Sequence, residues 1–149
     1  MTEARTARPI QRVDILGVQV SAIDMPLALD EIERWVAHGE AHYVCVTGVH
    51  GVMESQRDPE LLRIHNGSGL TTPDGMPMVW MGHRAGATWM ERVYGPDLML
   101  ALAERAAEHG WSSFFYGGKE GIAERLASRL QDRFPGFLVA GTYCPRFVR

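Results

Sequence analysis

The stretch from residue 112 to residue 141 restricts the possible folds of this chain more than any other part of the sequence. Residues 112–116 are rich in aromatic side chains and predict a strand, and the glycine-rich run 117–121 follows them. Residues 122–130 then place an apolar side chain at every fourth position, which indicates a helix with one buried face. Because residues 137–141 predict a second strand, the stretch as a whole indicates a βαβ unit with parallel strands.

The rest of the chain also alternates short apolar strands with helices. The apolar pattern of residues 13–20, broken at Gly17, predicts either a short hairpin or a bent edge strand. Helices are expected between Asp24 and Gly39 and over residues 52–56, 59–65, 76–81 and 96–109. A short buried strand is expected over 43–47, a loop over 48–51 and a brief strand over 70–72. This alternation predicts an α/β fold, Rossmann-like, with a mainly parallel sheet flanked by helices.

The length of the chain fits one domain. Its 149 residues suffice for a single core, and residues 1–10 are expected to form a disordered tail before a domain over residues 11–149. The sequence ends soon after a predicted strand, without the helix that would cover a parallel sheet there. We therefore expect the C-terminal part of the domain to be missing from this chain.

Composition excludes some classes of partner. The net charge of −3 gives no reason to expect a basic surface, so nucleic acid is not an expected partner. The sequence has no signal peptide and no apolar stretch of the roughly 20 residues that span a membrane. Cys45 and Cys144 lack a metal-binding spacing and are expected to be reduced thiols. We expect the protein to be cytoplasmic and at most attached to the surface of a membrane.

Two loops carry the residues best suited to chemistry. Asp74 stands in a Pro-Asp-Gly turn, where it is either a turn or N-cap residue or a general base at the carboxyl end of a strand. Judged on the local sequence alone, the turn is the favoured interpretation. Arg92 either forms an ion pair with Glu91 or Asp97 or holds a phosphate with its guanidinium fork.

Further polar positions follow other predicted strands. Thr47 could donate a hydrogen bond to a substrate, and His50 lies in the next loop and titrates in a useful range, although a lone histidine is more often structural. The glycine loop 117–121 either binds a diphosphate or a ribose or is simply a tight turn. Asp97 is most simply a first-turn residue of its helix.

Two further features bear on ligands and partners. Neither a metal site nor a cofactor is expected, because the acidic, histidine and cysteine residues show no ligand spacing. The methionine-rich stretch 76–90, with Trp80 and Trp89, either faces a lipid or a partner or fills the core.

The chain resembles the WecG/TagA/CpsF glycosyltransferase family of bacteria. The motifs that carry the resemblance are Val13-Asp14-Ile15-Leu16-Gly17-Val18, the Thr47 loop, Arg57-Asp58-Pro59-Glu60-Leu61, Pro73-Asp74-Gly75, Glu91-Arg92-Val93-Tyr94-Gly95-Pro96-Asp97-Leu98 and Phe114-Phe115-Tyr116-Gly117-Gly118. Pro-Asp-Gly alone is a weak signal, but its order with the Arg92 motif and the Gly117-Gly118 turn is specific.

The resemblance implies an inverting hexosyltransferase. It implies transfer of an N-acetylmannosamine-type sugar from a UDP-sugar to a polyprenyl-diphosphate-linked sugar. The implied products enter wall teichoic acid, common antigen, capsule or exopolysaccharide synthesis at the inner face of the membrane. The family continues with a further strand, a Pro-Lys-Gln-Glu-like segment and a basic membrane-contacting appendage, so the resemblance implies a truncated product or a fragment. An apolar surface left by the missing part would favour a homo-oligomer.

The same resemblance implies roles for individual residues. Asp74 matches the proposed catalytic base, Arg92 the arginine that stabilises the leaving diphosphate, and Thr47 a polar residue of the pocket. His50 lies where the family usually has an asparagine shortly after this threonine. The residues expected to bind substrate are Thr47, His50, Gly75, Gly95, Asp97, Gly117 and Gly118.

Two other functions compete with this prediction. The first is a non-catalytic, nucleotide-binding remnant of the same family. The second is a Rossmann-type oxidoreductase or methyltransferase, which is disfavoured because residues 117–121 match the dinucleotide-binding fingerprint poorly and lie late in the chain.

Overall fold

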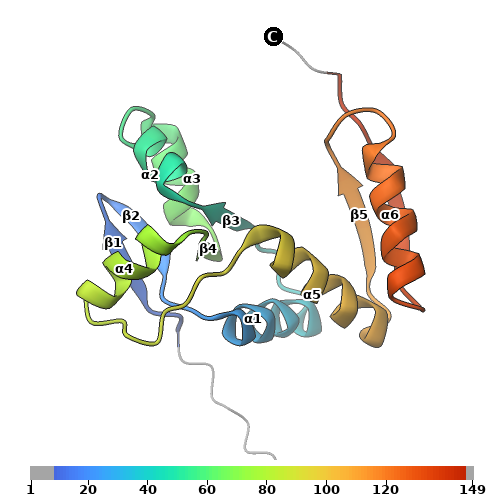
Figure 1. Ribbon diagram of the computed structural model, residues 1–149, viewed down its shortest axis with the longest axis horizontal. Coiled ribbons are helices and arrows are strands. Elements are labelled where there is room, and N and C mark those ends of the chain that lie inside the picture. Colours follow the sequence, from blue (N-terminus) through green and yellow to red (C-terminus); the bar gives the residue numbers. More distant parts are fainter. Residues whose placement is uncertain (1–8, 147–149) are drawn as a thin grey trace, which may run out of the picture. The chain divides into compact units, whose positions relative to one another are not determined.

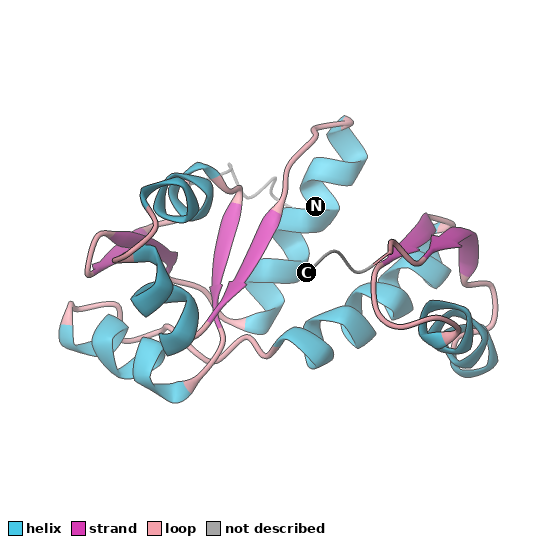
Figure 2. Cartoon of the chain, turned by 90° about the horizontal axis from the view of Figure 1, so that it is seen from above, coloured by secondary structure: helices cyan, strands magenta, loops and turns pink. Residues whose placement is uncertain are grey.

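The computed structural model of the protein describes residues 9–146, and its helices and strands alternate along the chain (Figure 1). In order they are β1 (Arg12–Ile15), β2 (Val18–Ser21), α1 (Met25–His38), β3 (Val44–Thr47), α2 (Val49–Ser55), α3 (Pro59–Gly67), β4 (Leu70–Pro73), α4 (Met76–Arg84), α5 (Gly95–His109), β5 (Ser112–Tyr116), α6 (Ile122–Arg133) and β6 (Leu138–Tyr143). The predicted α/β fold is confirmed: β3 pairs with β4 and β5 with β6, both in parallel, and helices accompany both pairs (Figure 2).

The chain divides into two units, Met1–Gly95 and Pro96–Arg149. Most of the tail predicted for residues 1–10 lies outside the described residues. One catalytic domain over residues 11–149 stays a prediction, as does a single Rossmann-like sheet. No helix within residues 9–146 is both long and apolar enough to cross a bilayer.

The first unit opens with a hairpin, so the first of the two alternatives for residues 13–20 is confirmed. β1 and β2 pair antiparallel, with Val13 opposite Val20 and Ile15 opposite Val18. Both residues of the connecting turn have positive φ, 52° at Leu16 and 87° at Gly17. A two-residue turn of that kind matches the right-handed twist of the strands it joins. It also fixes the register that turns the four apolar side chains to one face.

α1 and α3 begin as their sequences predict. The Asp24 side chain accepts a hydrogen bond from Leu27 N at 2.8 Å, and Gly39 ends α1 with φ 68°. The Asp58 side chain caps α3 by accepting from Glu60 N and Leu61 N. These caps satisfy N–H groups that have no partner inside the helix.

Three helix boundaries and the burial of one strand differ from the sequence prediction. α2 begins at Val49, so the loop predicted over residues 48–51 is wrong. α3 runs through Gly67 and α4 through Arg84, each beyond its predicted end. The strand over 43–47 is also less buried than expected, because only Thr47 is fully buried. Val49 and Gly51 are weak helix formers, and the packing of Val52 in the core outweighs that propensity in α2.

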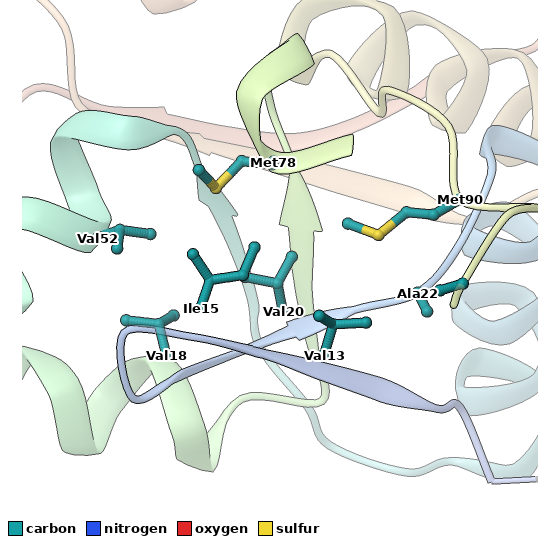
Figure 3. Close-up of a cluster of buried hydrophobic side chains, with 9 residues drawn as sticks. Val13, Ile15, Val18, Val20, Ala22, Val52, Met78 and Met90 are labelled. Atoms are coloured by element: carbon teal, nitrogen blue, oxygen red, sulfur yellow. The ribbon is translucent and has the colours of Figure 1, made fainter. Parts of the chain in front are cut away.

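The core of the first unit lies between the hairpin and the helices that follow β3 and β4. Side chains from β1, β2, α2 and α4 and from the segment after α4 meet there (Figure 3). The cluster consists of Val13, Ile15, Val18, Val20, Ala22, Val52, Met78, Ala87 and Met90. It holds α2 and α4 against the hairpin and so fixes the starts of both helices.

Val20→Ala is expected to lower the free energy of unfolding by about 2 kcal/mol, because it removes two buried methyl groups and leaves a cavity. Val20 is fully buried in the cluster, whereas Val36 on α1 is exposed and offers a matched control. Urea unfolding followed by circular dichroism would measure both variants. Equal midpoints for Val20→Ala and Val36→Ala would contradict the assignment of this cluster as the core.

The second unit contains the predicted βαβ arrangement. β5 pairs in parallel with β6, and α6 connects them. Ala103 and Ala106 of α5, Leu130 of α6 and Phe137 form its buried cluster. The sequence prediction for this unit is confirmed, with the second strand displaced by one residue at its start and extended to Tyr143.

Candidate active site

Asp74 directly follows β4, and Gly75 separates it from α4. Its N–H donates to the carbonyl oxygen of Thr47 at 2.9 Å, so the ends of the two parallel strands hold it in place. The N-cap of α4 is Gly75, and no side chain caps the helix. The interpretation of Asp74 as an N-cap is therefore wrong, and its half-buried carboxylate is available for other contacts.

Arg92 contacts the carboxylate of Asp74. Its Nη2 lies 3.6 Å from Asp74 Oδ1, and the two side chains are 45% and 24% exposed. The guanidinium also lies over the ring of Tyr94, 4.3 Å from its centroid, an arrangement that orients it. Within the described part of the first unit, the ion-pair partner of Arg92 is Asp74 and not Glu91. Asp97 belongs to the second unit, so a pair between Arg92 and Asp97 stays an open alternative.

Backbone hydrogen bonds bring the Arg92 loop to the end of β4. Val93 N donates to Pro73 O at 2.9 Å, and Glu91 N donates to Ile23 O at 3.0 Å. A partly exposed ion pair contributes only about 0–1 kcal/mol to stability. The loop is thus held by its backbone, and the Asp74–Arg92 pair is not needed to hold it.

Three glycines surround Asp74 and allow the backbone to come close. A Cβ on Gly48 would lie 2.7 Å from the carbonyl oxygen of Asp74. A Cβ on Gly95 would lie 3.1 Å from Val46 Cγ1 and 3.8 Å from Asp74 Oδ2. Gly75 has φ 130°, a conformation that residues with a side chain rarely adopt. Sequence reasoning placed Gly75 and Gly95 at the site but missed Gly48, whose only signal was its position directly after a strand.

Two helices begin beside this carboxylate. α2 has Gly48 and α4 has Gly75 as N-cap, and neither glycine supplies a side-chain acceptor for the first-turn N–H groups. Free N–H groups and the positive end of a helix dipole favour anions. Asp74 therefore sits where a negatively charged group would find both an arginine and backbone donors.

Thr47 and His50 occupy different environments at the end of β3. Thr47 is 1% exposed, and within residues 9–146 its Oγ1 has no hydrogen-bond partner. Thr72 Oγ1 on β4 shares this condition. A buried hydroxyl without a partner costs free energy. The participation of Thr47 in substrate binding stays a prediction. His50 is exposed in the first turn of α2.

The other predicted site residues belong to the second unit. Asp97 is exposed in the first turn of α5, as its simplest interpretation requires. Gly117 and Gly118 have φ of 108° and 77°, and Gly117 N donates to Tyr143 O at 2.9 Å. Gly121 is the N-cap of α6 and offers no side-chain acceptor. The participation of Asp97, Gly117 and Gly118 in one site with Asp74 stays a prediction.

Other candidate chemistry is limited. Within the described part of the chain, no three histidine, cysteine, aspartate or glutamate side chains group closely enough to hold a metal ion. Cys45 and Cys144 are free thiols, and burial raises the pKa of the Cys45 thiol above its ordinary value.

Comparison with known proteins agrees with the resemblance that the motifs indicate. A sequence model of the glycosyl transferase WecG/TagA/CpsF family matches residues 13–149. The chain is similar to N-acetylglucosaminyldiphosphoundecaprenol N-acetyl-beta-D-mannosaminyltransferase of Bacillus spizizenii, at 20% identity over 142 residues. That alignment covers 95% of this chain and 53% of the relative, so the chain spans about half the length of the curated relative it matches.

Proposed function

Because this chain belongs to the glycosyl transferase WecG/TagA/CpsF family, we propose that it transfers a sugar in the synthesis of a cell-surface polysaccharide. The proposed donor is a UDP-linked sugar of the N-acetylmannosamine type, and the proposed acceptor is a sugar on a polyprenyl diphosphate. The name of the Bacillus relative supports the choice of sugar and of acceptor. The proposed location is the cytoplasmic face of the membrane, with peripheral contact.

One observation carries this proposal: Arg92 Nη2 approaches Asp74 Oδ1 to 3.6 Å at the carboxyl end of β4. Ligands of open α/β sheets bind at that end of the strands. A carboxylate and an arginine suit glycosyl transfer from a nucleotide diphosphate, because the attacking hydroxyl loses a proton and the leaving diphosphate gains negative charge.

In the proposed reaction the acceptor hydroxyl attacks the anomeric carbon from the face opposite the diphosphate. Its proton passes to the Asp74 carboxylate as the new carbon–oxygen bond forms. The bond between the anomeric carbon and the diphosphate oxygen breaks in the same step, and the electron pair leaves with UDP. Direct displacement of this kind inverts the anomeric centre.

The leaving UDP gains negative charge, which Arg92 and the first-turn N–H groups of α4 would stabilise. Tyr94 keeps the guanidinium in place, since the arginine already lies over its ring. The buried Thr47 hydroxyl is proposed to donate to the bound donor. This arrangement supplies the stabilisation from protein groups, so we propose a reaction without a metal or cofactor.

The remaining roles concern the fit of the substrates. Gly75 and Gly95 let the backbone approach Asp74 closely and leave room for the donor. Gly117 and Gly118 are proposed to accommodate the nucleotide at the start of α6, with Asp97 as a further polar contact. His50 is proposed to offer a ring nitrogen to the substrate from the first turn of α2.

A non-catalytic, nucleotide-binding protein of the same family is the second candidate function, because Arg92 and the uncapped start of α4 could bind a diphosphate without any transfer. Calorimetric titration with UDP, run beside a transfer assay with labelled donor and a short-chain polyprenyl-diphosphate acceptor, separates the two. We expect both binding and transfer. Binding without transfer would support the second candidate, and absence of UDP binding would contradict both.

A further inference from the structure

α4 carries apolar side chains on both its buried and its exposed surface. Met78, Val79 and Gly82 are buried, and Met78 packs in the core cluster against the hairpin (Figure 3). The rest of the helix is exposed. Met76, Trp80, Met81 and Arg84 are the part of this exposed surface that we call the outer stripe of α4, and Pro77 and His83 are exposed beside them. A helix at the surface of a soluble unit normally has a polar outer face. We therefore expect the outer stripe to be a binding surface.

The outer stripe has a large apolar area at its centre. The Trp80 side chain is 61% exposed, Met76 lies one helical turn before it, and Met81 is the next residue and is exposed as well. Trp89, in the segment after α4, is also exposed, although its indole Nε1 donates to Ala22 O at 3.0 Å. Indole rings and flexible methionines of this kind are suited to the boundary between water and hydrocarbon.

The charges of the stripe also point to a particular partner. α1, α2 and α3 each carry at least one acidic residue, whereas α4 carries none and ends with the exposed Arg84. Residues 75–90 as a whole contain no aspartate or glutamate. In a chain with a net charge of −3, this is a surface that an anionic partner can approach without repulsion.

The position of the stripe relates it to the candidate active site. Met76 is two residues from Asp74, and Arg84 is eight residues further on, which is about 12 Å along a helix. A surface that touches the stripe is therefore next to the Asp74 carboxylate.

We propose that the outer stripe of α4 lies on the surface of a lipid bilayer with anionic head groups. Trp80, Met76 and Met81 enter the boundary between head groups and acyl chains, and Arg84 meets the lipid phosphates. This proposal rests on the proposed function, because it holds Asp74 beside the head group of a lipid-linked acceptor. The outer stripe would be the part of this chain through which the candidate active site meets the membrane.

Flotation with vesicles tests the proposal without donor or acceptor. We expect the chain to float with vesicles of phosphatidylcholine and phosphatidylglycerol, and Trp80→Glu to reduce the floating fraction about tenfold or more. Leu16→Glu is the matched control, because Leu16 is also 61% exposed but lies in the hairpin turn. Arg84→Glu should weaken binding to these vesicles more than to pure phosphatidylcholine. Circular dichroism melting confirms that each variant is folded, and Met81→Glu replaces Trp80→Glu if the latter unfolds.

Several results would overturn the inference. Wild-type chain that stays with the aqueous fraction would overturn it, as would equal flotation of Trp80→Glu and Leu16→Glu. A dimer by light scattering that Trp80→Glu converts to a monomer, with no flotation, would show a second copy on the stripe instead. Flotation without any transfer would contradict the proposed function alone, and transfer to a water-soluble acceptor without flotation would contradict this inference alone.

Discussion

Asp74→Asn is expected to lower sugar transfer by about 10²–10⁴-fold, the range that general-base catalysis contributes. The amide has nearly the shape of the carboxylate but does not accept the proton of the attacking hydroxyl. The fold should not change, because the hydrogen bond that holds Asp74 in place comes from its backbone N–H and not from its side chain. UDP binding should remain close to the wild-type value, since Arg92 and the helix N-termini are retained.

Steady-state kinetics with labelled donor would measure turnover, and calorimetric titration would measure UDP binding in the same preparation. Glu91→Gln is the matched control, because Glu91 is exposed on the neighbouring loop and its side chain is given no part in the reaction. Turnover of Asp74→Asn near that of Glu91→Gln would remove Asp74 from the role of base. Loss of UDP binding together with turnover would instead indicate that Asp74 positions the donor.

The fold was predictable from the sequence wherever local signals agree with tertiary packing. The hairpin around Gly17, the capped α1 and the βαβ unit from β5 to β6 all have this property. α2 does not, because Val49, His50 and Gly51 look like loop residues and become helical only when Val52 packs into the core. The exposure of Val46 on β3 could not be read from its sequence either, because short apolar strands look alike whether or not a neighbour covers them.

The candidate site, too, was predictable from the sequence only in part. The position of Asp74 after a predicted strand and the presence of Arg92 on a nearby loop indicated chemistry, and the structure adds their contact. The ion-pair partner of Arg92 could not be predicted, because Glu91 and Asp97 are nearer to it along the chain than Asp74 is. Gly48 was missed because the need for glycine there comes from the close approach of Asp74, a residue far away in sequence. Close approach between loops is a tertiary property and has no local sequence signal.

Arg92→Ala is expected to lower kcat by about 10²–10³-fold, the loss typical of removing one donor that stabilises developing charge. Arg92→Lys should recover only part of this, because an ammonium keeps the charge but lacks the planar fork and the contact with the Tyr94 ring. Stability should change by no more than about 1 kcal/mol, since the pair with Asp74 is partly exposed. Arg57→Ala, which removes an arginine with 79% side-chain exposure, is the matched control.

The kinetic pattern of Arg92→Ala distinguishes two ways in which this arginine could act. If the guanidinium binds the diphosphate equally well before and during bond cleavage, KM rises and kcat stays unchanged. If it stabilises the charge that develops on the leaving UDP, kcat falls more than KM rises. We expect the second pattern, because Tyr94 already orients the guanidinium beside the proposed reacting centre, where negative charge grows on the diphosphate as the bond breaks. A pure KM effect would leave Asp74 as base but would transfer the stabilisation of UDP to the N–H groups at the start of α4.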